Sequence, residues 1–256
     1  MVTLGDRLSA YKTDASFGVQ HGHMKRIAIL QSNYLPWRGY FDLMAYVDEF
    51  VFYDEVQYTS RDWRNRNRIK TPNGLQWLTV PVKYDYLSRP SIASIEINDD
   101  GWQALHWKTI ERNHARAPHA DAARKLLAPL YLEAPQCKLS DWNRHSIARI
   151  ARFLGIGTRL VDSTAYPSVA SDPTQRLVDI CIQAGATHYV SGPAARAYLR
   201  ESAFVERDLA VEWFDYDGYP PYPQLWGDFE PRVSVIDLLF NCGHDAARHL
   251  RYTHKD

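Results

Sequence analysis

Hydrophobic and polar positions follow two different periods along the chain. A short apolar run at residues 27–31 predicts a buried strand, because it ends at the Asn-x-x-Pro breaker of residues 33–36. A helix is expected over 37–47, where apolar positions recur at helical spacing: Tyr40, Phe41, Met44 and Val47. A second strand is expected at 50–53. A strand, a helix and a strand in such a short segment form a βαβ unit, whose two strands are parallel neighbours.

The same alternation returns in the last third of the chain. Strands are expected at 158–161, 188–190 and 210–214, and helices at 174–183, 194–200 and 234–241. The middle predicts a strand at 76–82, an extended stretch at 92–97, and a helical region over about 101–156 that is broken at Pro118, Pro129 and Pro135. Together these elements predict an α/β fold with a three-layer, mostly parallel, Rossmann-like sheet and an inserted helical cluster.

Composition narrows the class of protein. The 45% hydrophobic and 23% charged residues are typical of a globular chain, and 30 basic residues balance 30 acidic ones. Without a net charge, neither a nucleic acid nor a membrane surface is an expected partner. The three cysteines, Cys137, Cys181 and Cys242, have neither disulfide-framework nor zinc-site spacing, which favours a reducing cytoplasm.

The N-terminal segment lacks the patterns of the rest. Residues 1–23 contain no apolar stretch of the kind found in secretory signals, and no run in the chain has the roughly 18–20 apolar residues of a membrane helix. We therefore expect 1–23 to be a loose extension, 24–256 to be a single domain, and the protein to be soluble and cytoplasmic.

The first cluster of candidate site residues follows the first strand. Polar and aromatic side chains crowd this strand-to-helix turn, where helix N-terminal amides attract anions: Gln31, Asn33, Tyr34, Trp37 and Tyr40. This favours a pocket for an anionic or polar ligand with an aromatic wall, with Tyr34 as a candidate catalytic residue. In the alternative, Pro36 and Gly39 only shape the turn and the aromatic residues belong to the core.

The second cluster begins where the second strand ends. Asp54 is a candidate general base toward an amine or a hydroxyl, and Gln57 a candidate binding residue. Ligands bind at the carboxyl ends of parallel strands, so this cluster should face the first loop. An ordinary strand-end cap would explain Asp54 equally well.

A basic segment follows at 61–70. If it is extended, side chains alternate, so that Arg64, Arg66, Arg68 and Lys70 share one face and Asn65, Asn67 and Ile69 the other. Arginine suits phosphate and carboxylate groups, and amides suit sugar hydroxyls. The alternative is a solvated edge strand protected by its charges.

Three later motifs complete the candidates. Ser191 and Gly192 follow a strand and offer a hydroxyl and amides to a ligand, although a tight turn would explain them too. The proline-stiffened aromatic segment 216–226 suits a lid, a sugar-stacking wall or a wrapped structural loop. The histidines at 106, 114 and 119 lack metal-ligand spacing, so no metal is predicted.

Several strings in the chain resemble the WbqC-like protein family. They are Gln-x-x-Tyr-x-Pro-Trp-x-Gly-Tyr-Phe at 31–41, Asp-x-Val-Gln at 54–57, Trp-Arg-Asn-Arg-Asn at 63–67, Trp-Leu-Thr-Val-Pro-Val at 77–82, the segment 189–192, and 234–241 with its Leu-Leu-Phe-Asn ending. The resemblance extends from Met24 to about Arg251. Ser32 stands where the family usually has proline, and 114–118 replaces a tyrosine-led version. The resemblance implies bacterial surface-polysaccharide (O-antigen-type) biosynthesis, with transfer of glycine or a related aminoacyl group to a sugar.

Three functional hypotheses follow. The leading one is an acyl or aminoacyl transferase acting on an amino sugar, free or nucleotide-linked, for which the sequence indicates no particular cofactor. The second is a nucleotidylyltransferase-like enzyme using a nucleoside triphosphate and Mg²⁺. Its usual HxGH turn would lack both histidines at 37–40, so arginines would have to replace them. The third is a non-catalytic glycan- or nucleotide-binding protein.

Overall fold

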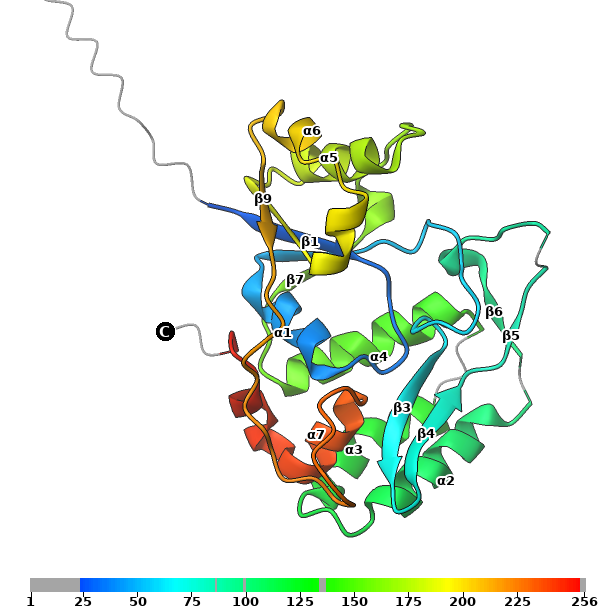
Figure 1. The fold of residues 1–256 in the computed structure, drawn as a ribbon. Helices are drawn as coiled ribbons and strands as arrows, with labels where there is room; N and C mark the ends of the chain where they lie inside the picture. The colour runs from blue at the N-terminus through cyan, green and yellow to red at the C-terminus, as the bar shows by residue number, and fades with distance from the viewer. Residues whose placement is uncertain (1–23, 86, 99, 134–136, 254–256) are drawn as a thin grey trace, which may run out of the picture.

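The computed structural model describes residues 24–85, 87–98, 100–133 and 137–253, and the extension expected at 1–23 lies outside this part (Figure 1). Its central sheet has five parallel strands in the order β7-β2-β1-β8-β9. The strands are β1 (Arg26–Leu30), β2 (Glu49–Phe52), β7 (Arg159–Asp162), β8 (His188–Ser191) and β9 (Ala210–Trp213). The expected α/β fold with a parallel sheet is confirmed.

The chain builds this sheet outward from β1 in both directions. β1 pairs in parallel with β2 on one side, Ile27 facing Glu49, and with β8 on the other, Arg26 facing His188. Numbered by their appearance in the chain, the sheet strands lie in the order 3-2-1-4-5 of a doubly wound sheet. The direction of winding therefore reverses between β1 and β8.

Two hydrophobic clusters lie on opposite faces of the sheet. Ile27 and Val51 pack with helix α5 (Pro173–Gln183) and short helix α6 (Ser202–Val205), whereas Ala28 and Phe50 pack into a larger core. Neighbouring strand residues point to opposite faces, which accounts for this division. The larger core includes residues of α1 (Arg38–Tyr46), α4 (Leu139–Phe153) and α7 (Val235–Cys242). The sheet is thus the middle of three layers (Figure 1).

A long insertion separates β2 from β7. It contains the antiparallel hairpin β3 (Arg66–Thr71) and β4 (Gly74–Thr79), and the short pair β5 (Val82–Lys83) and β6 (Glu96–Ile97). The expected helical segment consists of α2 (Trp102–His114), α3 (Ala120–Leu132) and α4. Among the described residues, no helix has the length and apolar character needed to cross a membrane.

Proline 129 does not break a helix, contrary to expectation. It lies inside α3, where it cannot donate a backbone hydrogen bond to the carbonyl of Lys125, four residues earlier. Arg149 of α4 supplies replacement donors, since its Nη2 donates to Lys125 O at 3.4 Å and its Nε to Leu126 O at 2.7 Å. A tertiary contact therefore stabilises the helix across the proline.

Three other local expectations were wrong. The strand expected at 76–82 is divided between β4 and β5, and the stretch at 92–97 forms a 3₁₀ helix (Ile92–Ser94) before β6. The helix expected at 194–200 is a 3₁₀ helix (Pro193–Ala197). Only Ala195 of this last element is buried, so it has no apolar face to stabilise a longer helix.

The alternation expected along β3 is confirmed except at its end. Asn67 and Ile69 are buried, while Arg66 and Arg68 lie on the more exposed face opposite Thr79 and Trp77 of β4. Lys70 departs from the pattern because it is buried, with its ammonium group donating to Gln224 Oε1 at 2.9 Å. That lysine holds the C-terminal part of the chain against the hairpin.

Candidate functional site

The loops that follow β1 and β2 lie against each other, as the topology required. Arg64 donates through Nη1 to Asn33 Oδ1 at 2.9 Å and through Nη2 to Gln31 Oε1 at 3.0 Å. The backbone joins the same loops, since Tyr34 N donates to Trp63 O at 2.9 Å. The guanidinium of Arg64 therefore fixes both amide side chains and the relative position of the two loops.

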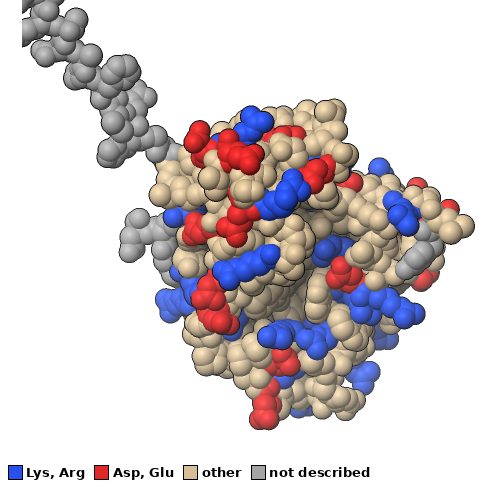
Figure 2. Space-filling view, turned by 45° about the horizontal axis from the view of Figure 1, so that its top comes forward, with Lys and Arg blue, Asp and Glu red and all other residues tan. Residues whose placement is uncertain are grey.

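A cavity of about 700 Å³ opens where the winding of the sheet reverses. Leu30 and Gln31 at the end of β1 line it on one side, and Ser191 and Gly192 at the end of β8 on the other. We call it the switch-point cavity. Its volume is that of a small-molecule site, and its position is where doubly wound sheets bind ligands. Figure 2 shows the surface hollowed near the middle of this face, with Lys and Arg side chains on its border.

Aromatic rings and a few polar groups make up the lining. Its polar side chains include an amide, two guanidinium groups and a hydroxyl: Gln31, Arg64, Arg176 and Ser191. Its aromatic rings are those of Trp37, Tyr53, Trp63, Tyr189, Tyr198 and Tyr216. Such a surface offers stacking and hydrogen bonding to a polar ligand with flat apolar faces, of which a sugar ring is the common case.

Two glycines make room for the aromatic wall. A Cβ at Gly39 would lie 2.3 Å from Cζ2 of Trp37, and one at Gly192 would lie 3.3 Å from Cε2 of Tyr216. Neither glycine has a positive φ, so close packing of the ring, rather than backbone conformation, accounts for the residue type. Trp37 and Tyr216 are themselves in contact, with ring centroids 5.4 Å apart.

The loop after β1 contains a strained residue. Leu35 is fully buried and has a φ of 42°, a left-handed conformation that is costly for a branched side chain. Its carbonyl accepts hydrogen bonds from Asn67 Nδ2 and Ser234 Oγ, both at 2.8 Å. Asn67 thus supports the loop that carries Trp37.

Asp54 lies behind the cavity wall rather than on it. It is 3% exposed, and its Oδ1 accepts a hydrogen bond from Ser32 N at 2.8 Å. Its Oδ2 has no hydrogen-bond partner among the described residues, and Arg144 Nε lies 3.9 Å away. Burial raises the pKa of this carboxyl group, while the Ser32 hydrogen bonds and the Arg144 charge oppose the rise. Asp54 therefore holds the β1 loop, and its role as a base stays a prediction.

Tyr34 points into the core. It is fully buried, and its hydroxyl lies 2.7 Å from Nδ1 of His106 and 2.8 Å from the hydroxyl of Tyr131. Burial raises the pKa of Tyr34 well above its usual value, so the phenol is neutral. The structure does not bring Tyr34 to the cavity, and its predicted catalytic role has no geometric support.

The remaining predicted residues divide into two groups. Asn33 and Asn67 line a smaller cavity that adjoins the first, as described below. The others lie away from the switch-point cavity: Tyr40, which donates to Gln31 O at 3.1 Å; Asn65, which donates to Val80 O at 3.0 Å; Arg66, on the outer face of the hairpin; and exposed Gln57, beside Tyr58. The structure thus brings Gln31, Trp37, Arg64, Ser191 and Gly192 together.

The lining residues absent from the predicted site include Tyr53, Arg176 and Tyr198. Tyr53 directly precedes Asp54, Arg176 lies in the first turn of α5, and Tyr198 follows the 3₁₀ helix after β8. Helix starts in an α/β fold lie at the same edge as strand ends, so Arg176 could have been found from its position in the pattern. Tyr198 carried no such signal.

The aromatic segment 216–226 packs against the rest of the protein and contributes one residue to the cavity wall. Tyr216 lines the cavity, while Tyr219 donates its hydroxyl to the buried Asp42 at 2.8 Å. The buried guanidinium of Arg38 lies 4.8 Å from the Tyr219 ring centroid and 5.3 Å from that of Tyr222. Buried polar and cation–π contacts therefore fix this segment.

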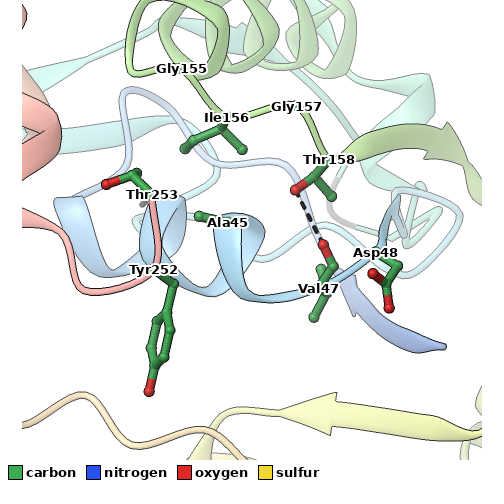
Figure 3. A pocket seen from close by; sticks show the side chains of 9 residues that line it. All are labelled: Ala45, Val47, Asp48, Gly155, Ile156, Gly157, Thr158, Tyr252 and Thr253. Carbon is green, nitrogen blue, oxygen red and sulfur yellow. Dashed lines mark hydrogen bonds between the residues drawn. The ribbon is translucent and has the colours of Figure 1, made fainter. Parts of the chain in front are cut away.

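A further cavity of about 370 Å³ lies at the opposite edge of the sheet (Figure 3). It is lined near the amino ends of β2 and β7 by Val47, Asp48 and Thr158, and Thr158 donates to the carbonyl of Val47 at 3.2 Å. Asp48 is engaged, because its Oδ2 accepts a hydrogen bond from Arg26 N. Parallel sheets bind ligands at the carboxyl ends of their strands, so the switch-point cavity is the stronger candidate for the ligand site.

Comparison with known proteins agrees with the resemblance of the motifs. The model of the WbqC-like protein family matches residues 31–249. An uncharacterized protein of Mycobacterium tuberculosis is 53% identical over 229 residues, which cover 90% of this chain and 99% of that protein. No solved structure matches the chain. The chain belongs to the WbqC-like protein family.

Proposed function

We propose that the protein is a transferase of bacterial surface-polysaccharide biosynthesis, which moves an acyl or aminoacyl group to an amino sugar held in the switch-point cavity. The observation that carries this proposal is the lining of that cavity. Aromatic rings such as Tyr198 and Tyr216 flank polar groups such as Gln31 and Ser191, and this combination suits a sugar ring with its hydroxyl groups. The family name associates these proteins with polysaccharide biosynthesis.

The proposed reaction forms a carbon–nitrogen bond. The amine of the sugar attacks the acyl carbonyl carbon of an activated donor, such as a thioester or an acyl phosphate. The bond from that carbon to the leaving group breaks, the leaving group departs with the bonding electron pair, and the amine loses a proton to a base. Asp54 is the candidate base: it lies behind the cavity wall, so the proton would reach its Oδ2, which accepts no hydrogen bond from the described residues, through a water molecule.

An asparagine at position 54 separates catalysis from loop support. Asp54→Asn keeps an oxygen that can accept the hydrogen bond from Ser32 N but removes the basic carboxylate. We expect this variant to bind the sugar with unchanged affinity and to lose turnover by about 10²-fold or more. Unchanged turnover would exclude Asp54 as the base.

Binding to the cavity is tested with Tyr198→Ala. Tyr198 is 69% exposed and lines the cavity, so its removal should not disturb folding. Wild type and variant are compared by isothermal titration with a panel of amino sugars, their phosphates and their nucleoside-diphosphate derivatives. We expect the sugar that binds wild type to bind Tyr198→Ala at least tenfold more weakly. Leu105→Ala is the control, since Leu105 is 64% exposed and lines none of the cavities described.

Two outcomes would overturn the proposal. Equal affinity of wild type and Tyr198→Ala for every sugar that binds would place the ligand elsewhere. Release of diphosphate from a nucleoside triphosphate would instead support a nucleotidylyltransferase.

A further inference from the structure

A smaller cavity of about 310 Å³ adjoins the switch-point cavity. Trp37 and Trp63 line both, so their indoles form the boundary between the two. The rest of the smaller cavity combines amide and guanidinium side chains with a proline: Asn33, Pro36, Asn67, Arg68 and Arg232. We call it the arginine cavity. Its chemistry is more cationic than that of its larger neighbour.

Two exposed indoles stand beside the arginine cavity. Trp63 is 43% and Trp77 is 42% exposed, and their ring centroids lie 5.6 Å apart. Exposed tryptophans in contact are unusual unless a ligand or partner covers them. The backbone of Trp63 is fixed on both sides, because its N–H donates to Asp62 Oδ1 and its carbonyl accepts from Tyr34 N. The structure thus presents two adjacent exposed rings, one of them on a backbone segment fixed by hydrogen bonds.

Guanidinium groups are ordered around these rings without carboxylate partners. Arg66 lies 4.2 Å and Arg68 5.6 Å from the Trp77 ring centroid. Within the described part of the chain, neither these two side chains nor that of Arg232 forms an ion pair, and the Nε atoms of Arg66 and Arg68 have no hydrogen-bond partner. Arg68 donates to the carbonyl of Arg232 at 3.1 Å, which holds the two residues together. These positive charges are thus not neutralised by a carboxylate of the described residues.

We propose that the arginine cavity and Trp63 bind a nucleoside diphosphate, with the base stacked on the Trp63 indole and the phosphates paired with Arg68 and Arg232. A stacking surface next to unpaired guanidinium groups matches a base joined to a diphosphate, and arginine forks suit phosphate oxygens. The shared boundary then lets a sugar on the terminal phosphate enter the switch-point cavity. The proposal rests on the proposed function and makes its substrate a nucleotide-linked sugar.

Calorimetric titration of the full chain with uridine and guanosine diphosphates tests this assignment. We expect Arg232→Gln to weaken binding of the preferred nucleotide at least tenfold. Trp63→Ala should weaken nucleotide binding but leave the weak binding of inorganic diphosphate unchanged, because that anion has no base. Arg207→Gln is the charge-matched control, since Arg207 is exposed and lines neither cavity.

Three results would overturn the assignment. They are nucleotides that bind no more tightly than inorganic diphosphate, an affinity unchanged in Arg232→Gln, and the absence of nucleotide binding at millimolar concentration. Amino-sugar phosphates whose binding depends on Tyr198 in the absence of nucleotide binding would refute the arginine cavity and leave the transferase proposal standing. A folded Arg232→Gln protein, checked by circular dichroism, is required for each comparison.

Discussion

Single polar side chains beneath the cavity wall decide the position of the residues on it. Asn67 does not face the switch-point cavity, but its amide donates to the carbonyls of Leu35 and Tyr34 at 2.8 Å and 3.3 Å. Asp54 likewise accepts a hydrogen bond from Ser32 N. The sequence identified both residues as part of the site, and the structure gives them positioning contacts.

Asn67→Ala should destabilise the protein through these carbonyls. Removing the amide takes this donor away from the carbonyl of Tyr34 and leaves that of Leu35 with Ser234 Oγ alone, which costs about 1–3 kcal/mol. Urea unfolding should show this loss. Asn73→Ala is the matched control, because Asn73 is exposed in the hairpin turn and should change stability by less than about 0.5 kcal/mol. Equal stability of the two variants would show that the amide does not hold the loop.

His106 gives the protein a pH-dependent stability. Burial lowers the pKa of His106 to about 4, against an opposing backbone hydrogen bond at Thr79, whereas an unfolded histidine has a pKa of about 6.5. Between these values the unfolded chain binds more protons. The stabilisation that comes from keeping His106 neutral is therefore complete above about pH 6.5 and is lost as the pH falls toward 4. The difference between the two pKa values corresponds to about 3 kcal/mol of unfolding free energy.

Urea unfolding between pH 4.5 and 7 measures this effect. The difference in stability between wild type and His106→Gln should shrink as the pH falls, because the wild type loses the contribution of neutral His106 and glutamine does not titrate. All other titratable groups are the same in both proteins. A difference that stays constant with pH would contradict the buried, neutral state of His106.

At the scale of elements, the regular parts of the fold and the parallel pairing of β1 with β2 could be predicted, whereas the irregular parts could not. β1, α1 and β2 were expected from local periodicity within one or two residues of their observed bounds. The continuous α3 could not be predicted, because it depends on the tertiary contact of Arg149 with the carbonyl of Lys125.

The candidate site follows the same division. Gln31 and Ser191 could be found because they follow strands whose ends share one edge of the sheet. The sequence could not show that Tyr34 turns into the core, since neighbouring loop residues have no fixed period. Nor could it show that Tyr198, beyond the 3₁₀ helix, returns to the cavity.

The start of α1 offers a test of how the aromatic wall is packed. Gly39→Ala improves helix propensity by about 1 kcal/mol, yet its methyl group would overlap the Trp37 ring. We expect a folded protein in which that ring is displaced, seen as a shift of the Trp37 resonance in ¹⁹F NMR of the 5-fluorotryptophan protein. Gly157→Ala is the control, because no atom lies within 4 Å of a Cβ there. An unmoved Trp37 resonance in Gly39→Ala would contradict the packing described.

On the scale of the whole molecule, segments far apart in the chain converge at one edge of a doubly wound sheet. The loops after β1 and β2, the turn after β8 and the wrapped aromatic segment all line the switch-point cavity. The cavity of Figure 3 lies at the other edge of the same sheet. Which edge binds ligand is therefore the central question for function.

Hydrogen exchange in the presence of a saturating uridine-diphosphate amino sugar answers it most directly. We expect slower exchange in peptides that cover residues 31–40, 61–68 and 189–198, with no change in peptides that cover 45–48 and 155–158. Protection confined to 45–48 and 155–158, or no protection anywhere, would contradict the assignment of the switch-point cavity as the substrate site.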